Sequence, residues 1–386
     1  MDKFGLNILE QFVLIDSGSE NFEGVSAVQR LMMGELQKIG MKARLLPNPK
    51  DSELSAELLI AEKNGLKKDK YVTLVCHADT VYDSDFGFQG LKIDSEGRWA
   101  NGPGVIDDKG GMVVALWGLK MFFEKTQGQH KFSYRLVSSP NEEVGSIGFH
   151  DLFREIGQNS EVILGFEPAF EDGAFVNRRQ GNRWYEVKIQ GREAHSGRDH
   201  AYGVNAGHEL SIKLAEILAL TNYEKGVTLS VAEIKAGTNK YNIVCGQAKA
   251  KIDMRFQDPK IGDETHQKIL EILNKPFVKS SVDGLTASTR YRLADDCPPF
   301  NPIEDSSLYV EELRSLIRKH EKIDTPPPRR GAAADCCYMA REGILILDGM
   351  GPRGSGMHQS SERILISSLE ARAKVLCDFL EFLEAR

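Results

Sequence analysis

The sequence lacks the features that mark a membrane protein or a nucleic-acid-binding protein. None of its apolar runs approaches the roughly 20 residues that a membrane-spanning helix needs. Its formal net charge is −7 at pH 7, whereas binding to nucleic acid requires a basic surface that neutralises phosphates. We therefore expect neither a membrane nor a nucleic acid as a partner.

Cysteine is scarce, and its spacing is not that of a metal site. The chain of 386 residues has six cysteines: Cys76, Cys245, Cys297, Cys336, Cys337 and Cys377. This pattern favours reduced, mostly buried thiols in a cytoplasmic enzyme. The N-terminal stretch MDKFGLNILEQFVLIDSGSE has an amphipathic helix pattern rather than that of a signal peptide. We expect a cytoplasmic location, and a periplasmic one stays open if a signal peptide has been removed.

The length exceeds what one hydrophobic core usually holds, so two domains are expected. In the first half, helical and strand patterns alternate, which favours an α/β domain with a mainly parallel sheet. The predicted helices there are 25–39 and 109–125, and the predicted strands are 42–46, 56–62, 71–76, 131–138 and 161–166. The same pattern returns late in the chain, with helices at 306–320, 335–342 and 367–384 and a strand at 344–348.

Between these halves the pattern changes to four strands and two helices. The segments RWYEVKIQG, VTLSVAEIKAG, QAKAKIDMRF and TASTRYRL read as strands, and VNAGHELSIKLAEILAL and ETHQKILEILNKPF as helices. This composition predicts a small antiparallel sheet with two helices on it. We therefore expect an α+β domain at 180–293, inserted into a discontinuous catalytic domain formed by 1–179 and 294–386.

Five short stretches contain side chains that could bind metal ions. They are VCHADTVYD (75–83), NGPGVIDDKGGM (101–112), SSPNEEVGS (138–146), LGFEPAF (164–170) and GSGMHQSSE (354–362). A single His or Glu in a loop is usually solvated or caps a helix. Several of these residues, however, directly follow predicted strands, and ligands of open α/β sheets bind at the carboxyl ends of strands. We therefore expect them to converge.

Imidazole and carboxylate ligands without cysteine favour catalytic zinc, with manganese and cobalt as alternatives. Three carboxylates and two neutral imidazoles around two divalent ions leave one positive charge, which a bridging hydroxide would neutralise. This charge balance favours a site with two metal ions, which a carboxylate bridges at a separation of about 3.5–4 Å.

The motifs HADTVYD, GPGVIDDKGG, NEEVG, FEP and MHQSSE resemble, in this order, those of the di-zinc metallopeptidase and aminoacylase family. The resemblance covers nearly the whole chain and is greatest to the glutamate carboxypeptidase branch. It implies that Asp107 bridges two metal ions. His77 and Glu167 would complete the coordination of one ion, and Glu143 and His358 that of the other.

The resemblance also assigns the residues around the metal ions. Asp79 would accept the second N–H of the His77 imidazole and hold its tautomer. Glu142 would stand beside the bridging hydroxide as general base and pass the proton to the leaving nitrogen. The Asp107–Asp108 peptide bond would be cis. The neighbouring charges of Glu142 and Glu143 are explained in this way, because the metal ions offset their repulsion.

For the inserted domain, the resemblance implies a homodimer formed through 180–293 and a contribution to the active site. His195, in REAHSGRDH, would reach the cleft of the partner subunit and stabilise the oxyanion. Asn242 and Arg255 match family positions that hold the substrate carboxylate or the oxyanion. Gly331 matches the start of a glycine-rich substrate-binding segment, but Ala332–Ala334 depart from it, and Asp335 could cap the following helix. Arg329 and Arg330 are candidates for gripping a carboxylate.

The resemblance implies a metal-dependent hydrolase that acts on a small molecule or short peptide. The enzyme would cleave a peptide or N-acyl amide bond next to a free C-terminal carboxylate, as glutamate carboxypeptidases do. An aminoacylase or deacetylase acting on small N-acyl amino acids is the alternative. A non-catalytic binding protein is disfavoured, because the five metal ligands and Glu142 are all present.

Overall fold

The computed structural model describes residues 4–53, 55–328 and 333–386, which form two compact units. The first unit is discontinuous, and contains the chain up to Arg178 and most of the chain from Phe300 onward. The second unit is the insertion Arg179–Pro299. The sequence placed the end of this insertion at 293. The unit extends further because its last strand continues to Cys297.

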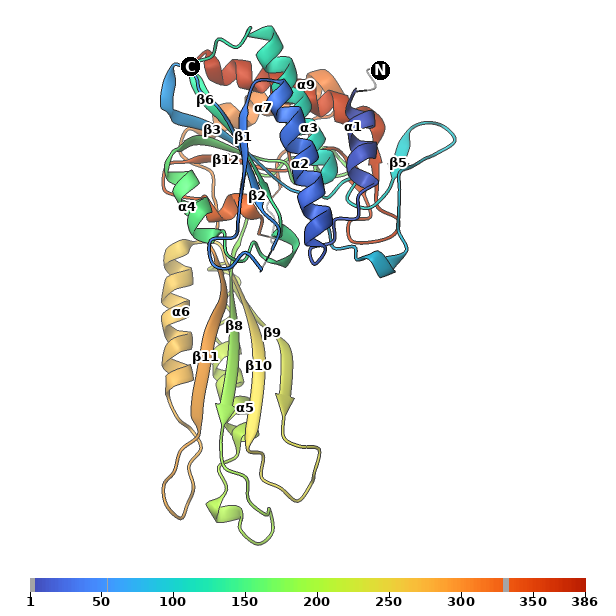
Figure 1. Ribbon diagram of the computed structural model, residues 1–386. Coiled ribbons are helices and arrows are strands. Elements are labelled where there is room, and N and C mark those ends of the chain that lie inside the picture. The colour runs from blue at the N-terminus through green and yellow to red at the C-terminus, as the bar shows by residue number, and fades with distance from the viewer. Residues whose placement is uncertain (1–3, 54, 329–332) are drawn as a thin grey trace. The chain divides into compact units, whose positions relative to one another are not determined.

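The first unit is built on a six-stranded sheet with the strand order β1-β2-β6-β3-β7-β12 (Figure 1). The strands are β1 (Lys42–Leu46), β2 (Leu58–Lys63), β3 (Lys67–His77), β6 (Phe132–Ser139), β7 (Ser160–Gly165) and β12 (Leu345–Leu347). β6, β3, β7 and β12 are parallel to one another, whereas β2 pairs antiparallel with both β1 and β6. The predicted α/β class with a mainly parallel sheet is confirmed.

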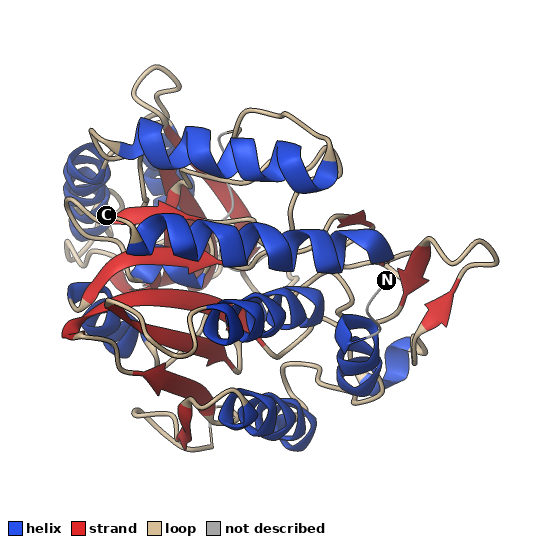
Figure 2. Ribbon diagram, turned by 90° about the horizontal axis from the view of Figure 1, so that it is seen from above, coloured by secondary structure: helices blue, strands red, loops and turns tan. Residues whose placement is uncertain are grey.

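Helices lie on both faces of this sheet (Figure 2). The helices of this unit are α1 (Phe4–Val13), α2 (Phe22–Lys38), α3 (Lys109–Lys125), α4 (His150–Gln158), α7 (Ser306–Glu321), α8 (Asp335–Tyr338) and α9 (Ile366–Glu384). α3 packs with α1, α2 and α9, and α7 packs with α9, whereas α4 packs with α8. α3 is apolar on nearly all sides, as expected of a helix enclosed by other elements.

A second, small sheet in this unit was not predicted. Its strands are β4 (Lys92–Ile93), β5 (Trp99–Asn101), β13 (Gly354–Ser355) and β14 (Arg363–Leu365), in the order β13-β14-β5-β4. Strands this short give no detectable alternation in a sequence. The pairing of β14 with β5 joins the loop after Asn101 to the loop that precedes Arg363, and both loops carry predicted metal ligands.

The second unit is an antiparallel sheet with two helices, as the sequence predicted. Its strand order is β11-β8-β10-β9. The elements are β8 (Gly181–Gln190), α5 (Ala206–Leu218), β9 (Val227–Ala236), β10 (Gln247–Phe256), α6 (Pro259–Asn274) and β11 (Ser288–Cys297). Every second residue of β10 is buried along its whole length. The buried side chains of the strands pack with those of α5 and α6 in one hydrophobic cluster.

Two local predictions differ from the structure. The predicted helix 335–342 is only Asp335–Tyr338, because the chain then turns at Gly343, which has a positive φ of 76°, into β12. α4, with the sequence HDLFREIGQ, was not predicted. Only three of its residues, Phe153, Ile156 and Gly157, are buried, so its apolar face is narrow.

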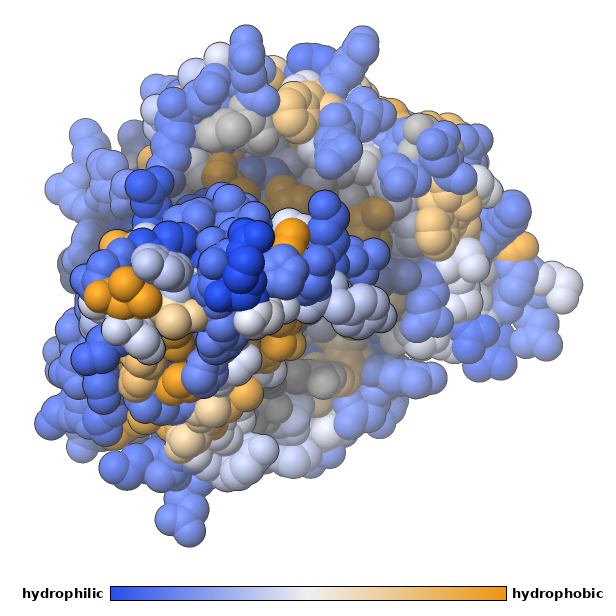
Figure 3. Space-filling model, turned by 90° about the horizontal axis from the view of Figure 1, so that it is seen from below, coloured by the Kyte–Doolittle hydropathy of each residue, from blue (hydrophilic) through white to orange (hydrophobic). Residues whose placement is uncertain are grey.

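Neither the hydropathy of the surface in this view nor that of the described helices is that of a membrane-spanning protein. In the view of Figure 3, hydrophobic residues form small separate patches on a mostly hydrophilic face, the usual pattern for a protein surface in water. Among the described residues, no helix has both the length and the apolar character needed to cross a membrane.

A buried ion pair joins α7 and α9. The Arg372 side chain is fully buried, and its Nε lies 2.6 Å from Glu321 Oε2. Its Nη2 donates a hydrogen bond to the Gly173 carbonyl oxygen at 2.5 Å. Removing one partner of a buried pair leaves the other charge without compensation in a medium of low polarity.

We predict that Arg372→Met lowers the free energy of unfolding by about 3–5 kcal/mol, because it leaves the Glu321 carboxylate buried and unpaired. Urea unfolding followed by circular dichroism measures this change. Lys374→Met on the same helix is the matched control, since Lys374 forms an exposed pair with Glu370 and its loss should cost only about 0.5 kcal/mol. Equal midpoints for the two variants would contradict the prediction.

Candidate metal centre

The predicted metal ligands of the first unit lie at the carboxyl ends of neighbouring parallel strands. His77 is the last residue of β3. Glu142 and Glu143 form a short turn after β6, and Glu167 follows β7 by two residues. β3 lies between β6 and β7 in the sheet, so their carboxyl ends meet at one edge, where ligands of such sheets bind.

Two further ligands come from loops that the small sheet holds together. Asp107 lies in the loop between β5 and α3, and the Asp107–Asp108 peptide bond is cis. His358 lies in the loop between β13 and β14, with a positive φ of 61°. Such a backbone conformation is uncommon for a residue other than glycine and often marks a functional site.

The structure brings these side chains into two groups that share one residue. His77, Asp107 and Glu167 each offer a ligand atom within 4.8 Å of the others, and so do Asp107, Glu143 and His358. All five residues predicted as metal ligands are therefore in the groups, and Asp107 belongs to both.

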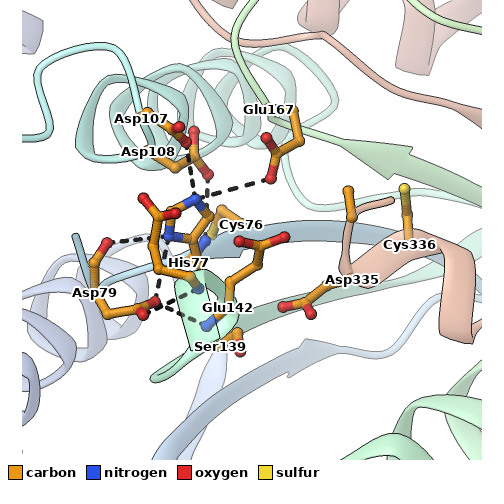
Figure 4. Close-up of polar contacts among 12 residues, drawn as sticks. Cys76, His77, Asp79, Asp107, Asp108, Ser139, Glu142, Glu167, Asp335 and Cys336 are labelled. Atoms are coloured by element: carbon orange, nitrogen blue, oxygen red, sulfur yellow. Dashed lines mark hydrogen bonds and ion pairs between the residues drawn. The ribbon is translucent and has the colours of Figure 1, made fainter. Parts of the chain in front are cut away.

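The carboxylate of Asp107 lies between two imidazoles. Its Oδ1 is 3.0 Å from His77 Nε2, and its Oδ2 is 3.2 Å from His358 Nε2. Glu167 Oε1 is 3.8 Å from His77 Nε2, and Glu143 Oε2 is 3.4 Å from His358 Nε2. In Figure 4 the carboxylates of Glu167 and Glu142 face the same space as the His77 ring. Each oxygen of Asp107 thus faces a different group, as a bridging carboxylate requires.

The electrostatics of the cluster favour cations. Hydrogen bonds to Asp107 and Glu143 raise the pKa of His358 to about 10. Burial disfavours the charged form of His77, but hydrogen bonds to Asp107 and Asp79 outweigh this and raise its pKa well above the usual value. Burial raises the pKa of Glu142 well above its usual value, and the charge of Glu167 raises it further. A cluster of carboxylates that raises the pKa of two imidazoles in this way also attracts divalent cations.

The donor set fits divalent metal ions. Nitrogen and oxygen donors with no sulfur are the usual ligands of catalytic zinc and related ions. Glu143 Oε1 is buried and has no hydrogen-bond partner among the described residues, although buried polar atoms normally have one. A cation in the group of Asp107, Glu143 and His358 would satisfy this oxygen.

Asp79 supports the cluster, but its contacts differ from the predicted ones. The nearest acceptor for His77 Nδ1 is the backbone carbonyl oxygen of Asp79 at 3.0 Å, and the Asp79 carboxylate is 3.4 Å away. The carboxylate mainly accepts hydrogen bonds from the backbone N–H groups of Glu142 and Glu143, at 2.9 and 3.2 Å. The Ser19 hydroxyl donates a third at 2.7 Å. Asp79 therefore fixes the turn that carries both glutamates.

Sequence reasoning assigned no role to Glu362, the last residue of MHQSSE. Its carboxylate is fully buried and accepts hydrogen bonds from the backbone N–H groups of Gly104, Ile106 and Asp107, at 3.3, 2.8 and 3.2 Å. Burial raises the pKa of Glu362 to about 7. Through these hydrogen bonds, the Glu362 side chain fixes the backbone of the loop that carries Asp107. An acidic residue that follows His358 by four positions was the available signal.

Asp335 also supports the glutamate turn. It was considered as a helix cap, but the cap position of α8 is Ala334. The Asp335 carboxylate is buried and accepts a short hydrogen bond from the Ser146 hydroxyl, which lies 3.0 Å from the Ser139 hydroxyl. Burial raises the pKa of Asp335 to about 7. Figure 4 shows its carboxyl group on the side of Glu142 and Ser139.

In the second unit, His195 and Asn242 lie on adjacent segments. The Ser196 N–H donates to the Asn242 carbonyl oxygen at 3.0 Å, and both His195 and Asn242 are exposed. His195 Nδ1 accepts hydrogen bonds from the N–H groups of Gly197 and Arg198, each at 3.2 Å. The neutral ring therefore carries its proton on Nε2, which is a donor.

The remaining predicted substrate-binding residues are less informative. Arg255 lies in β10, and its Nε is 2.9 Å from Asp253 Oδ2. Gly331, Arg329, Arg330 and Ala332 lie outside the described residues.

The segment GMGPRG (349–354) has the GxGxxG spacing of dinucleotide-binding loops, but it leads into the short strand β13 instead of the helix that this fingerprint requires.

The fold is shared with solved metallopeptidase structures. A tripeptidase from Staphylococcus aureus superposes with a TM-score of 0.77 at 19% identity, covering 100% of this chain and 99% of that chain. An M20 family metallo-carboxypeptidase from Sulfolobus solfataricus gives a TM-score of 0.75 at 16% identity and covers 100% of both chains. At this level of identity, these likenesses concern the fold alone.

Sequence comparisons extend the likeness to function. Residues 177–281 match a family described as a peptidase dimerisation domain of the M20 type. The chain is 27% identical over 374 residues to carboxypeptidase G2 of Pseudomonas sp. strain RS-16, which covers 95% of this chain and 86% of that protein. The chain belongs to the M20 peptidase family. As an M20 metallohydrolase it is similar to peptidases and carboxypeptidases, and the two His/Asp/Glu groups are its candidate metal ligands.

The M20 relatives also include enzymes named for a different reaction. The chain is 24% identical over 297 residues to the succinyl-diaminopimelate desuccinylase of Ectopseudomonas mendocina strain ymp, covering 74% of each protein. The M20 family membership therefore establishes a metallohydrolase and leaves the acyl or peptidyl group open.

We predict that Glu362→Gln lowers metal affinity about 10–100-fold, as is typical when a supporting hydrogen bond around a metal ligand is lost. The new amide NH₂ would face the N–H donors of Gly104, Ile106 and Asp107, so the loop must move. Competition with a chromophoric chelator measures the affinity. Glu370→Gln, on the outer part of α9, is the control and should bind metal as the wild type does. An unchanged affinity in Glu362→Gln would show that the carboxylate does not position Asp107.

Proposed function

We propose that this M20 protein cleaves a peptide or N-acyl amide bond next to a free C-terminal carboxylate. The observation that supports the proposal most is the position of Asp107, with one oxygen toward His77 and the other toward His358. The 27% identity to carboxypeptidase G2 over 95% of the chain supports a carboxypeptidase. The expected cytoplasmic location stays a prediction.

We propose two divalent metal ions, most simply zinc, with cobalt and manganese as alternatives. His77 and Glu167 would hold one ion, Glu143 and His358 the other, and Asp107 both. This assignment uses every member of the two observed groups. Such ions, when bound, polarise the scissile carbonyl and lower the pKa of water.

Glu142 is the proposed general base. Its carboxylate faces the cluster but belongs to neither ligand group, so it is available to carry a proton. Burial and the charge of Glu167 raise its pKa, which favours a carboxyl group that can hold a proton. It would take the proton from the attacking water and deliver it to the leaving nitrogen.

The second unit is proposed to form a homodimer and to complete the active site of the partner subunit. The match of residues 177–281 to a peptidase dimerisation domain supports the dimer. His195 would donate its Nε2–H to the oxyanion, since its Nδ1 is occupied by two backbone N–H groups. Asn242 would assist on the neighbouring segment, and Arg255 and Gly331 remain candidates for holding the substrate carboxylate.

An aminoacylase or deacetylase activity on small N-acyl amino acids is the second candidate. The similarity to succinyl-diaminopimelate desuccinylases over 74% of the chain favours it. Both reactions hydrolyse an amide next to a carboxylate, so the same ligands and the same base would serve either one.

We predict that Glu142→Gln keeps both metal ions and loses at least about 10³-fold in kcat, because the proton carrier is lost while the ligands remain. Glu143→Gln is the matched control and should lose metal. Metal content is measured by mass spectrometry, and turnover on N-acyl amino acids and on peptides ending in Glu, Asp, Leu or Arg. Near-normal kcat in Glu142→Gln would refute the assignment. Cleavage of N-acyl amino acids alone would favour the second candidate.

A mixing experiment tests the contribution of the partner subunit. Glu142→Gln and His195→Ala should each be inactive as homodimers. After subunit exchange of equal amounts, half of the dimers are mixed and each has one complete site, so about a quarter of the wild-type activity should return. If the dimer mixes, as shown by mass spectrometry, and no activity returns, His195 does not act across the dimer.

A further inference from the structure

The first unit contains a cavity of about 380 Å³ that the proposed function does not use. It is lined by residues 13–17, 80, 82–83, 88–90, 103 and 109. None of the five proposed metal ligands is among them. Its volume is in the range of small-molecule sites, about 300–1,000 Å³.

Two buried residues of the cavity lining, Lys109 and Ser17, can donate further hydrogen bonds. Lys109 is fully buried, and its ammonium donates one hydrogen bond, to the Ile15 carbonyl oxygen at 2.9 Å. Among the described residues, no carboxylate lies within ion-pair distance of this ammonium, which has three N–H donors, and the charges of Glu362 and Asp16 act on it only from a greater distance. The Ser17 hydroxyl is also buried and has no hydrogen-bond partner there. A buried ammonium with one acceptor and a buried hydroxyl with none are costly, so this part of the lining favours an anionic group.

The outer part of the cavity has the opposite charge. Asp16 is partly buried and Asp83 is exposed, and neither forms an ion pair within the described part of the chain. The lining also includes the apolar side chains of Leu14 and Phe88. Phe88 packs edge-on against Tyr82, with ring centroids 5.2 Å apart, which fixes this side of the lining.

We propose that this cavity binds a small zwitterion, an α-amino acid with an apolar side chain. Its carboxylate would accept hydrogen bonds from Lys109 and Ser17, and its ammonium would face Asp16 and Asp83. A simple anion would meet the two aspartates, and a simple cation would meet Lys109, so only a ligand with both charges matches both ends. The apolar side chain would pack on Leu14 and Phe88.

The cavity adjoins the segment that supports the proposed base. The Thr80 N–H donates to the Ser17 carbonyl oxygen at 2.9 Å, and Ser19 donates to the Asp79 carboxylate that holds Glu142. The zwitterion class follows from the cavity alone. Only the choice of an amino acid as the natural ligand rests on the proposed function, because amino acids are the products of that reaction. The site would then sense product next to the catalytic turn.

Calorimetric titration of the full chain, freed of metal ions with a chelator, tests the proposal. The metal ions are removed because amino acids bind to them. The probes are L-leucine, 4-methylpentanoate, which lacks the amino group, and 3-methylbutylamine, which lacks the carboxylate. L-leucine should bind at least about tenfold more tightly than either analogue, since each analogue loses one charged contact. Equal binding of 4-methylpentanoate, or no binding of any probe at millimolar concentration, would overturn the proposal.

Three variants locate the binding site. Ser17→Ala and Phe88→Ala should each weaken L-leucine binding about fivefold to tenfold, because one loses a donor and the other an apolar side chain. Phe86→Ala is the matched control, since Phe86 belongs to the same aromatic cluster but does not line the cavity. Unchanged affinity in both Ser17→Ala and Phe88→Ala would refute the location. If the wild type binds L-leucine but hydrolyses none of the N-acyl amino acids and peptides, only the proposed function is refuted.

Discussion

The carboxylate of Asp107 lies between two imidazoles, with Oδ1 3.0 Å from His77 Nε2 and Oδ2 3.2 Å from His358 Nε2. The rest of the site depends on this contact, because Asp107 is the one residue common to both ligand groups. The imidazoles come from the end of β3 and from the loop before β14, which are distant in sequence. Crowding carboxylates around them is costly unless positive charge is supplied, and this requirement explains why glutamates can be neighbours in the turn after β6.

Three buried carboxylates outside the two candidate groups form hydrogen bonds with the loops that carry the candidate ligands. Asp79 fixes the backbone of Glu142 and Glu143, Glu362 fixes the loop of Asp107, and Asp335 holds Ser146 at the end of the glutamate turn. The oxygens of each carboxylate accept hydrogen bonds mainly from backbone N–H groups or from hydroxyls. The ligands therefore depend on loops whose geometry is set by hydrogen bonds, as a preformed metal site requires. The positions of the candidate ligands therefore depend on the folded backbone around them.

Much of this could be predicted from the sequence, because long elements and ligand motifs leave strong signals. Periodicity was sufficient for the parallel sheet and for the inserted sheet with its two helices, and all five residues of the two candidate groups lie in the ordered motifs. The small sheet could not be predicted, because β4 and β13 have only two residues each. The role of Glu362 could not be predicted either. Its burial and its hydrogen bonds to backbone N–H groups depend on the pairing of β5 with β14, and the sequence alone does not distinguish it from a surface glutamate. The contacts of Asp79 depend on backbone geometry that residue types do not reveal.

We propose that a pair of metal ions is held by His77, Asp107, Glu143, Glu167 and His358. The most direct measurement is a crystal structure of the zinc-loaded protein with anomalous scattering recorded on both sides of the zinc absorption edge. We expect two anomalous peaks about 3.5–4 Å apart, with Asp107 between them. A single peak, or peaks away from Asp107, would contradict this proposal.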